Sequence, residues 1–105
     1  KTIIFLGGSQ GAKDINDIAI KIAPILYKKN INIIHQTGKR DFQRVKKWYQ
    51  DKNIKADVFN FDKNLINKIT QADFAISRAG ASTLFELASN LLPTLFIPYP
   101  YAAGD

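Results

Sequence analysis

Cysteine is absent from this sequence, and histidine and tryptophan each occur once. Without cysteine the chain has no disulfide framework and no thiolate metal site. The single histidine, His35, stands without a cluster of carboxylates or cysteines, so it does not make a zinc site either. We therefore expect neither a bound metal nor a cofactor.

Long apolar runs are also missing. No stretch reaches the roughly 20 residues of a membrane-spanning helix, and no signal peptide is visible. The sequence contains no methionine. It opens directly in a strand-like run, and it stops at Gly104-Asp105 without a closing helix. Its 105 residues suffice for one small domain. We interpret residues 1–105 as a single domain truncated at both ends.

Basic residues outnumber acidic ones by fifteen to nine, which gives a net charge of +6. Such a balance favours anionic partners: nucleotides, phospholipid surfaces or nucleic acid. A solvated, lysine-rich surface explains the same numbers. A nucleic-acid-binding module requires a continuous basic stripe and an exposed aromatic platform. Because the lysines are dispersed along the chain, we expect no nucleic-acid partner.

Apolar runs of strand length alternate with segments of helical period along the whole chain. This order predicts an α/β fold, a Rossmann-like parallel sheet with helices on both faces. The expected strands are Thr2–Leu6, Ile31–His35, Ala56–Phe61, Phe74–Ser77 and Thr94–Ile97, and the expected helices are 12–29, 41–51, 64–71 and 83–90.

The first two helices carry apolar stripes. In the first we expect Pro24 to kink or shorten the helix. The predicted stripe of the first helix is Ile15, Ile18, Ala19, Ile22, Ile25 and Leu26. The predicted aromatic part of the core, partly from the second helix, is Phe42, Trp48, Tyr49, Phe59 and Phe61.

Three unusual loops follow predicted strands, at residues 7–11, 61–64 and 78–83. In open parallel sheets, ligands bind outside the carboxyl ends of the strands. The glycines of loop 7–11 permit positive φ and close approach to a ligand, and the next helix offers free N–H groups to a phosphate. A tight turn without a ligand is the alternative for that loop taken alone.

The loop at residues 78–83 combines small residues with polar ones. Backbone N–H groups of Ser82 and Thr83 suit a diphosphate at the helix start. Glu86 suits a ribose diol, but Thr83 to Glu86 also matches the capping box, in which Glu86 only returns a bond to the cap. Arg78 is either a phosphate contact or a packing residue.

His35 and Asp73 have simpler interpretations. A catalytic base at His35 is one interpretation, and a hydrogen-bonded structural histidine is the one we favour. Asp73 precedes the fourth strand, where we expect it to cap or close the turn.

Taken together and in order, these motifs resemble one known family. They are Gly7-Gly8-Ser9-Gln10-Gly11-Ala12, His35-Gln36-Thr37-Gly38-Lys39, Ala72-Asp73, Arg78-Ala79-Gly80-Ala81-Ser82-Thr83 with Glu86, Pro93 and Pro98. The chain, from Thr2 to Asp105, is similar to the C-terminal domain of the GT-B glycosyltransferases of family 28.

The resemblance implies a specific activity. The domain would bind UDP-N-acetylglucosamine for an inverting enzyme that transfers N-acetylglucosamine to undecaprenyl-diphospho-muramoylpentapeptide (lipid I to lipid II) in peptidoglycan synthesis. The acceptor site and the catalytic base would lie in an N-terminal domain, so this chain alone would be inactive. The enzyme would sit peripherally on the cytoplasmic face of the bacterial inner membrane. Another nucleotide-sugar enzyme of this fold and a split transferase subunit are the alternatives.

The resemblance also implies the donor-binding residues. Asp62 stands where the family makes a backbone contact to uracil, usually at an apolar residue, and a backbone contact survives that substitution. The implied contacts to UDP-N-acetylglucosamine are Ser9, Gln10, Asp62, Ala81, Ser82, Thr83, Leu84, Phe85 and Glu86. No metal is implied.

Overall fold

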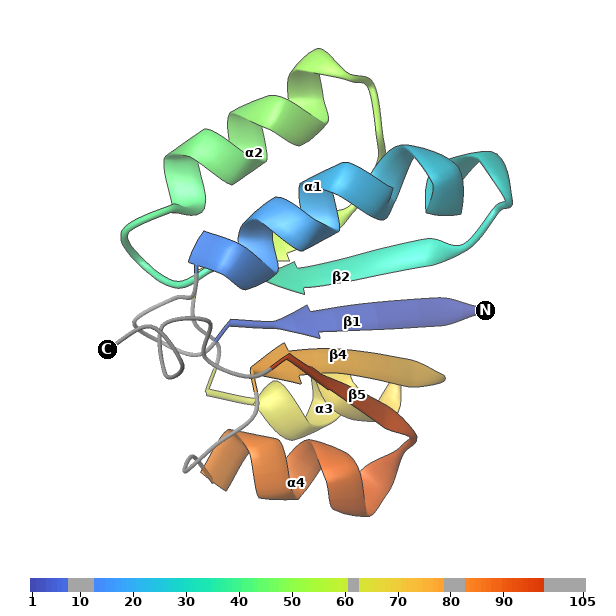
Figure 1. The fold of residues 1–105 in the computed structure, drawn as a ribbon, viewed down its shortest axis with the longest axis vertical. Helices are drawn as coiled ribbons and strands as arrows, with labels where there is room; N and C mark the ends of the chain where they lie inside the picture. The colour runs from blue at the N-terminus through green and yellow to red at the C-terminus, as the bar shows by residue number, and fades with distance from the viewer. Residues whose placement is uncertain (8–12, 61–62, 79–82, 98–105) are drawn as a thin grey trace.

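The computed structural model describes residues 1–7, 13–60, 63–78 and 83–97, which form a parallel sheet flanked by helices (Figure 1). The strands lie in the order β3-β2-β1-β4-β5, and every neighbouring pair is parallel. The predicted fold class is confirmed. The elements are β1 Thr2–Leu6, α1 Lys13–Lys28, β2 Asn32–Gln36, α2 Phe42–Asp51, β3 Asp57–Phe59, α3 Leu65–Thr70, β4 Phe74–Arg78, α4 Thr83–Leu91 and β5 Thr94–Ile97.

Helices cover both faces of the sheet, with α1 and α2 on one face and α3 and α4 on the other (Figure 1). Because side chains alternate along a strand, β1 contributes to both layers. Ile3 and Phe5 pack toward α1 and α2, whereas Ile4 and Leu6 pack toward α3 and α4. A strand buried on both faces needs a continuous apolar run, which is what residues 2–6 provide. None of the helices in the described ranges is long and apolar enough to cross a membrane.

Helices α1 and α2 end in the same way. Asn30 and Asn53 have φ of 61° and 57°, in the left-handed region that asparagine tolerates better than most residues. After α1, the amide of Ile31 donates to the carbonyl of Leu26; after α2, the amide of Ile54 donates to the carbonyl of Tyr49. These bonds are Schellman motifs, which satisfy the last carbonyls of each helix and turn the chain toward the next strand.

This ending explains one shift between prediction and structure. The second strand was expected to begin at Ile31, but the Ile31 amide closes the Schellman motif, and β2 spans Asn32–Gln36. The third strand is also shorter than predicted, at Asp57–Phe59.

Of the two outcomes expected at Pro24, shortening does not occur: α1 continues to Lys28, because packing of the flanking turns outweighs the weak helix propensity of proline. A kink at Pro24 stays a prediction. The buried position predicted for Ile25 is wrong. Ile25 is 55% exposed. At about 100° per residue, the buried stripe centres on Ile15, Ala19 and Ala23, and Ile25 lies beyond its edge.

The predicted aromatic core is confirmed in part. Tyr49 is buried, and Trp48 is half-buried with its ring 5.2 Å from that of Tyr49. Phe59 packs against the α3/α4 layer, and Phe42 lies at the rim of its helix, where Lys46 covers its ring. Phe61 lies outside the described residues.

Candidate functional site

The carboxyl edge of the sheet brings together the ends of β1, β3 and β4, which precede the three predicted loops. Strand β1 pairs with β2 on one side and β4 on the other. The chain therefore builds the sheet outward from β1 in one direction, through β2 and β3, and then in the other, through β4 and β5. Ligands of open α/β sheets bind at such a switch point, outside the carboxyl ends of the strands. Segments 8–12 and 79–82 follow the two strands that meet there.

Two helices begin at the same edge. Because each follows a parallel strand, the amino ends of α1 and α4 lie on the side where β1 and β4 end. The free N–H groups and the positive dipole end of a helix favour an anion such as a diphosphate. The edge therefore has the backbone architecture of a phosphate-binding site.

A buried polar network supports this edge from the α1/α2 side. Asn16, in the first turn of α1, uses its side-chain Nδ2 to donate to the Thr37 carbonyl (3.1 Å) and to Asp41 Oδ2 (2.9 Å). Its Oδ1 lies 2.7 Å from His35 Nε2, and His35 Nδ1 lies 2.9 Å from the Tyr49 hydroxyl. Asn16, His35 and Thr37 are fully buried. Satisfied polar groups of this kind fix positions because hydrogen bonds are directional.

The network determines the tautomer of His35. Since Asn16 Nδ2 donates twice, Asn16 Oδ1 must accept, so His35 Nε2 carries the proton. His35 Nδ1 then accepts from the Tyr49 hydroxyl. Burial lowers the pKa of His35 to about 3 and raises that of Tyr49. His35 is thus a neutral structural histidine, the interpretation that the sequence favoured, and both its ring nitrogens are engaged.

Asp41 connects this network to the surface. It stands at the cap position of α2, yet its carboxylate makes no capping bond. Instead it accepts one hydrogen bond from Asn16 and two from Arg44, the latter at 2.7 and 2.6 Å. Arg44 also reaches Asp17 at 2.9 Å, which joins α2 to α1. The hydrogen bond from Arg44 lowers the pKa of Asp41, and that from Lys13 lowers the pKa of Asp17. Both carboxylates are therefore ionised at neutral pH.

Comparison with known proteins identifies the family. Residues 2–105 match the C-terminal domain of glycosyltransferase family 28. The chain belongs to this family. The resemblance that the motifs indicated is confirmed, and so is its coverage of the chain.

Two relatives of this family 28 domain share a name. A protein of Nitratiruptor sp. is 70% identical over 99% of this chain, and one of Campylobacter jejuni is 65% identical over all of it. Both are named UDP-N-acetylglucosamine–N-acetylmuramyl-(pentapeptide) pyrophosphoryl-undecaprenol N-acetylglucosamine transferase. The crystal structure of Acinetobacter baumannii MurG superimposes with a TM-score of 0.75 at 32% identity, over 98% of this chain. This chain spans 31% of the length of each of the three.

The predicted donor contacts of the family 28 domain fall in two groups. Thr83, Leu84, Phe85 and Glu86 form the first turn of α4, directly after segment 79–82, and only their backbone is described. Those outside the described residues are Ser9, Gln10, Asp62, Ala81 and Ser82. Strands β1 and β4, which precede segments 8–12 and 79–82, meet at the switch point, whereas β3, which precedes Asp62, is separated from β1 by β2. The contacts themselves stay predictions.

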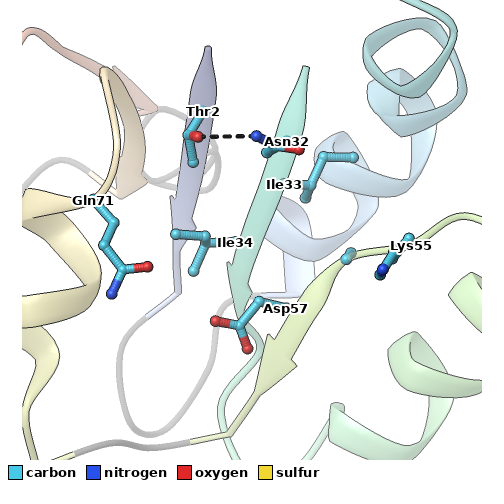
Figure 2. Close-up of a pocket in the computed structure, with 8 residues that line it drawn as sticks. Thr2, Asn32, Ile33, Ile34, Lys55, Asp57 and Gln71 are labelled. Atoms are coloured by element: carbon cyan, nitrogen blue, oxygen red, sulfur yellow. Dashed lines mark hydrogen bonds between the residues drawn. The ribbon is translucent and has the colours of Figure 1, made fainter. Parts of the chain in front are cut away.

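The opposite, amino edge of the sheet carries the hollow shown in Figure 2, with a volume of about 430 Å³. It is bordered by the starts of β1, β2 and β3, where Asn32 donates to the Thr2 hydroxyl at 3.5 Å. Asp57 within it is paired with Lys68. Asp73 closes the same edge: its carboxylate accepts from the Thr2 amide and its own amide donates to the Thr2 carbonyl, both at 2.8 Å. These bonds join the turn before β4 to the start of β1, and the capping or turn-closing role of Asp73 stays a prediction. The lining residues are Thr2, Asn32, Ile33, Ile34, Lys55, Ala56, Asp57 and Gln71.

Asn16 and Asp41 were missed by sequence reasoning. The partners of Asn16, which include Asp41, are 19 to 25 residues away, so no local pattern indicates these bonds. The single available signal was a polar residue, Asn16, beside the apolar stripe of α1, directly after Ile15. Among the described residues there is no group of three histidine or carboxylate side chains arranged to hold a metal.

Proposed function

We propose that this domain binds UDP-N-acetylglucosamine as the donor half of an inverting N-acetylglucosaminyltransferase. Its acceptor is undecaprenyl-diphospho-muramoylpentapeptide, so the enzyme converts lipid I to lipid II in peptidoglycan synthesis. The observation that carries the proposal is the family 28 match over residues 2–105, together with the name shared by relatives 65–70% identical to this chain. The switch-point architecture supports it, because the two helix starts favour a diphosphate at that edge.

The reaction is a displacement at the anomeric carbon. The acceptor oxygen attacks that carbon, the bond from the sugar to the diphosphate breaks, and UDP leaves. The proton of the acceptor passes to a base outside this domain. Negative charge develops on the leaving diphosphate, and the amino ends of α1 and α4 stabilise it electrostatically. The task of this domain is to hold the donor and to stabilise its leaving group.

The same proposal places the protein on the cytoplasmic surface of the inner membrane. Its acceptor carries an undecaprenyl chain, and the +6 charge of this domain favours anionic lipid headgroups. Sedimentation of the full-length protein with vesicles, with and without anionic lipid, tests this. Binding that needs anionic lipid and weakens with salt supports it, and equal sedimentation with neutral vesicles contradicts it.

The decisive assay is transfer of radiolabelled N-acetylglucosamine from its UDP derivative to lipid I by the full-length protein. We expect labelled lipid II and free UDP. Calorimetry with UDP-N-acetylglucosamine, UDP, GDP and a short single-stranded RNA defines the ligand class. Binding of the uridine ligands alone supports the proposal, and binding of RNA alone replaces it with a basic nucleic-acid module.

Glu86→Gln separates the two interpretations of Glu86. Glutamine serves in a capping box as well as glutamate, so the melting temperature should not change. A ribose hydroxyl bound to a carboxylate loses a charge-assisted bond, so the Kd for UDP should rise about tenfold. An unchanged Kd would leave Glu86 with the capping role alone.

A further inference from the structure

We propose that Asn16, held by His35 and Asp41, is a positioning residue that fixes the amino end of α1 at the donor-binding edge. The inference rests on the proposed function, because it assigns this helix end a share in donor binding. It is carried by the hydrogen bonds of Asn16 and of Gly7, the residue directly after β1.

The end of β1 and the start of α1 are tied to the same place. The amide of Gly7, directly after β1, donates to the Gln36 carbonyl at 3.2 Å. Asn16, in the first turn of α1, donates to the carbonyl of Thr37 at 3.1 Å. Gln36 and Thr37 are consecutive residues at the carboxyl end of β2, so the end of β1 and the start of α1 share one anchor.

The anchor is itself held rigidly. Thr37 donates its amide to the Phe59 carbonyl of β3 at 2.9 Å, so the Asn16 acceptor is tied to the sheet. The Asn16 amide has a single orientation, because Asp41 accepts from its Nδ2 and His35 donates to its Oδ1. Gly38, with φ of 79°, allows the turn between Thr37 and Asp41 that only glycine adopts readily.

Stability alone does not require this arrangement. Apolar side chains of equal volume stabilise a helix on a sheet as well as a satisfied polar group does. The central cluster of the α3/α4 layer is built that way, with Ile69 and Ala88 against Ile4 and Leu6. What hydrogen bonds add is a fixed distance and direction. Small displacements of substrate-positioning groups cost up to about a hundredfold in rate, so fixed geometry is needed at the donor edge.

The test is Asn16→Asp in the full-length protein, with Ile69→Ala as the matched control. The aspartate keeps the shape of Asn16 but places a carboxylate, without a donor, against the Thr37 carbonyl and Asp41. Ile69→Ala destabilises the opposite layer and touches none of the network. We expect Asn16→Asp to raise the Kd for UDP and the KM for the donor about tenfold. Ile69→Ala should leave both within about twofold of wild type although it lowers the melting temperature.

A swapped pair adds a rescue. Asn16→Asp combined with Asp41→Asn restores a donor between the two side chains, and part of the lost UDP affinity should return. Equal UDP affinity loss in Asn16→Asp and Ile69→Ala at equal loss of melting temperature overturns the proposal. So does an unchanged Kd in a folded Asn16→Asp variant.

If Asn16→Asp does not fold, Tyr49→Phe decides. It removes only the hydroxyl that donates to His35 Nδ1, and the Kd for UDP should still rise about threefold at a preserved fold. No change overturns the inference. Failure of the proposed function gives a different result, because then wild-type protein binds no uridine ligand at all.

Discussion

The two faces of the sheet are packed with different chemistry. The cluster on the α3/α4 face consists of Ile4, Leu6, Ile34, Ile69, Ala75 and Ala88, and alternation along β2 and β4 places the buried Gln36 and Ser77 on this face at its carboxyl end. The α1/α2 face adds to its apolar cluster the buried hydrogen bonds among Asn16, His35 and Tyr49. Apolar burial is non-directional, whereas a buried polar group must meet its partner in one geometry. The apolar clusters of both layers therefore supply stability, and the Asn16 network adds a defined position for the chain beside the switch point.

The largest expected effect comes from the apolar face. Ile69→Ala removes buried methyl and methylene groups from a fully buried site and should lower the free energy of unfolding by about 2–5 kcal/mol. Urea unfolding followed by the fluorescence of Trp48, which lies on the other face, measures it. A loss under about 1 kcal/mol would mean that the layer collapses around the deletion and that the apolar face contributes less to stability than its burial indicates.

The next effect is confined to the polar face and depends on pH. Burial holds the pKa of His35 near 3 in the fold, below its value of about 6.5 in the unfolded chain. As the pH falls, the unfolded state binds the proton before the folded state does. The contribution of neutral His35 to the free energy of unfolding is therefore fully present above pH 6.5 and is lost as the pH drops toward 3. Between pH 8 and pH 5 this histidine should cost about 2 kcal/mol.

The control for this prediction is His35→Gln, whose stability should vary much less over the same range. Urea midpoints at several pH values measure both proteins. Parallel curves would show that His35 does not cause the dependence. Asp17 and Asp41, with lowered pKa values, act in the same direction but only below about pH 4.

A smaller loss should follow removal of one hydroxyl from the polar network. Tyr49→Phe leaves His35 Nδ1 without its donor in a buried site and should cost about 1–2 kcal/mol. Tyr27→Phe is the matched control, since Tyr27 is 45% exposed and should change stability by under about 0.5 kcal/mol. Equal effects for the two variants would remove the distinction between a network that is needed and one that is incidental.

The smallest effect separates the helix ends of the two layers. Asn30→Ala should lower the free energy of unfolding by about 1 kcal/mol, because a positive φ is less favourable for alanine than for asparagine. Asn30→Gly should be close to neutral. Gln71, at the end of α3, has a right-handed φ of −78°, so Gln71→Ala should be silent. Thermal unfolding compares the three. A costly Gln71→Ala would show that the α3 end is specified as strictly as that of α1.

The sequence was sufficient for the fold because its signals are local. Strands β1 and β5 have the predicted bounds, since each is an apolar run between clear breaks. Errors arose where local signals compete. Ile25 looked buried because it is apolar, yet the helix angle decides exposure, and Ile31 looked like a strand residue until its amide was needed to end α1.

The candidate site was predictable in outline only. The loops after β1, β3 and β4 could be assigned to one edge because parallel strands share their carboxyl ends. The partners of His35 could not be predicted, because Asn16 reaches His35 only after α1 has packed across β2. For Glu86 the local pattern supports two roles, and only the family resemblance favours one of them.

The position of β1 also bears on how the chain is made. Its partner on one side, β2, lies 30 residues further along, whereas Asp73, which bonds to Thr2 beside β4, lies 71 residues away. At about 5–20 residues per second, synthesis reaches that second partner roughly 4–14 s after β1. Once β2 has paired, the other edge of β1 stays uncovered until β4 has been made, and an unpaired strand edge is a template for pairing with another chain. Residues 2–6 are therefore a segment at which the nascent domain is open to mispairing.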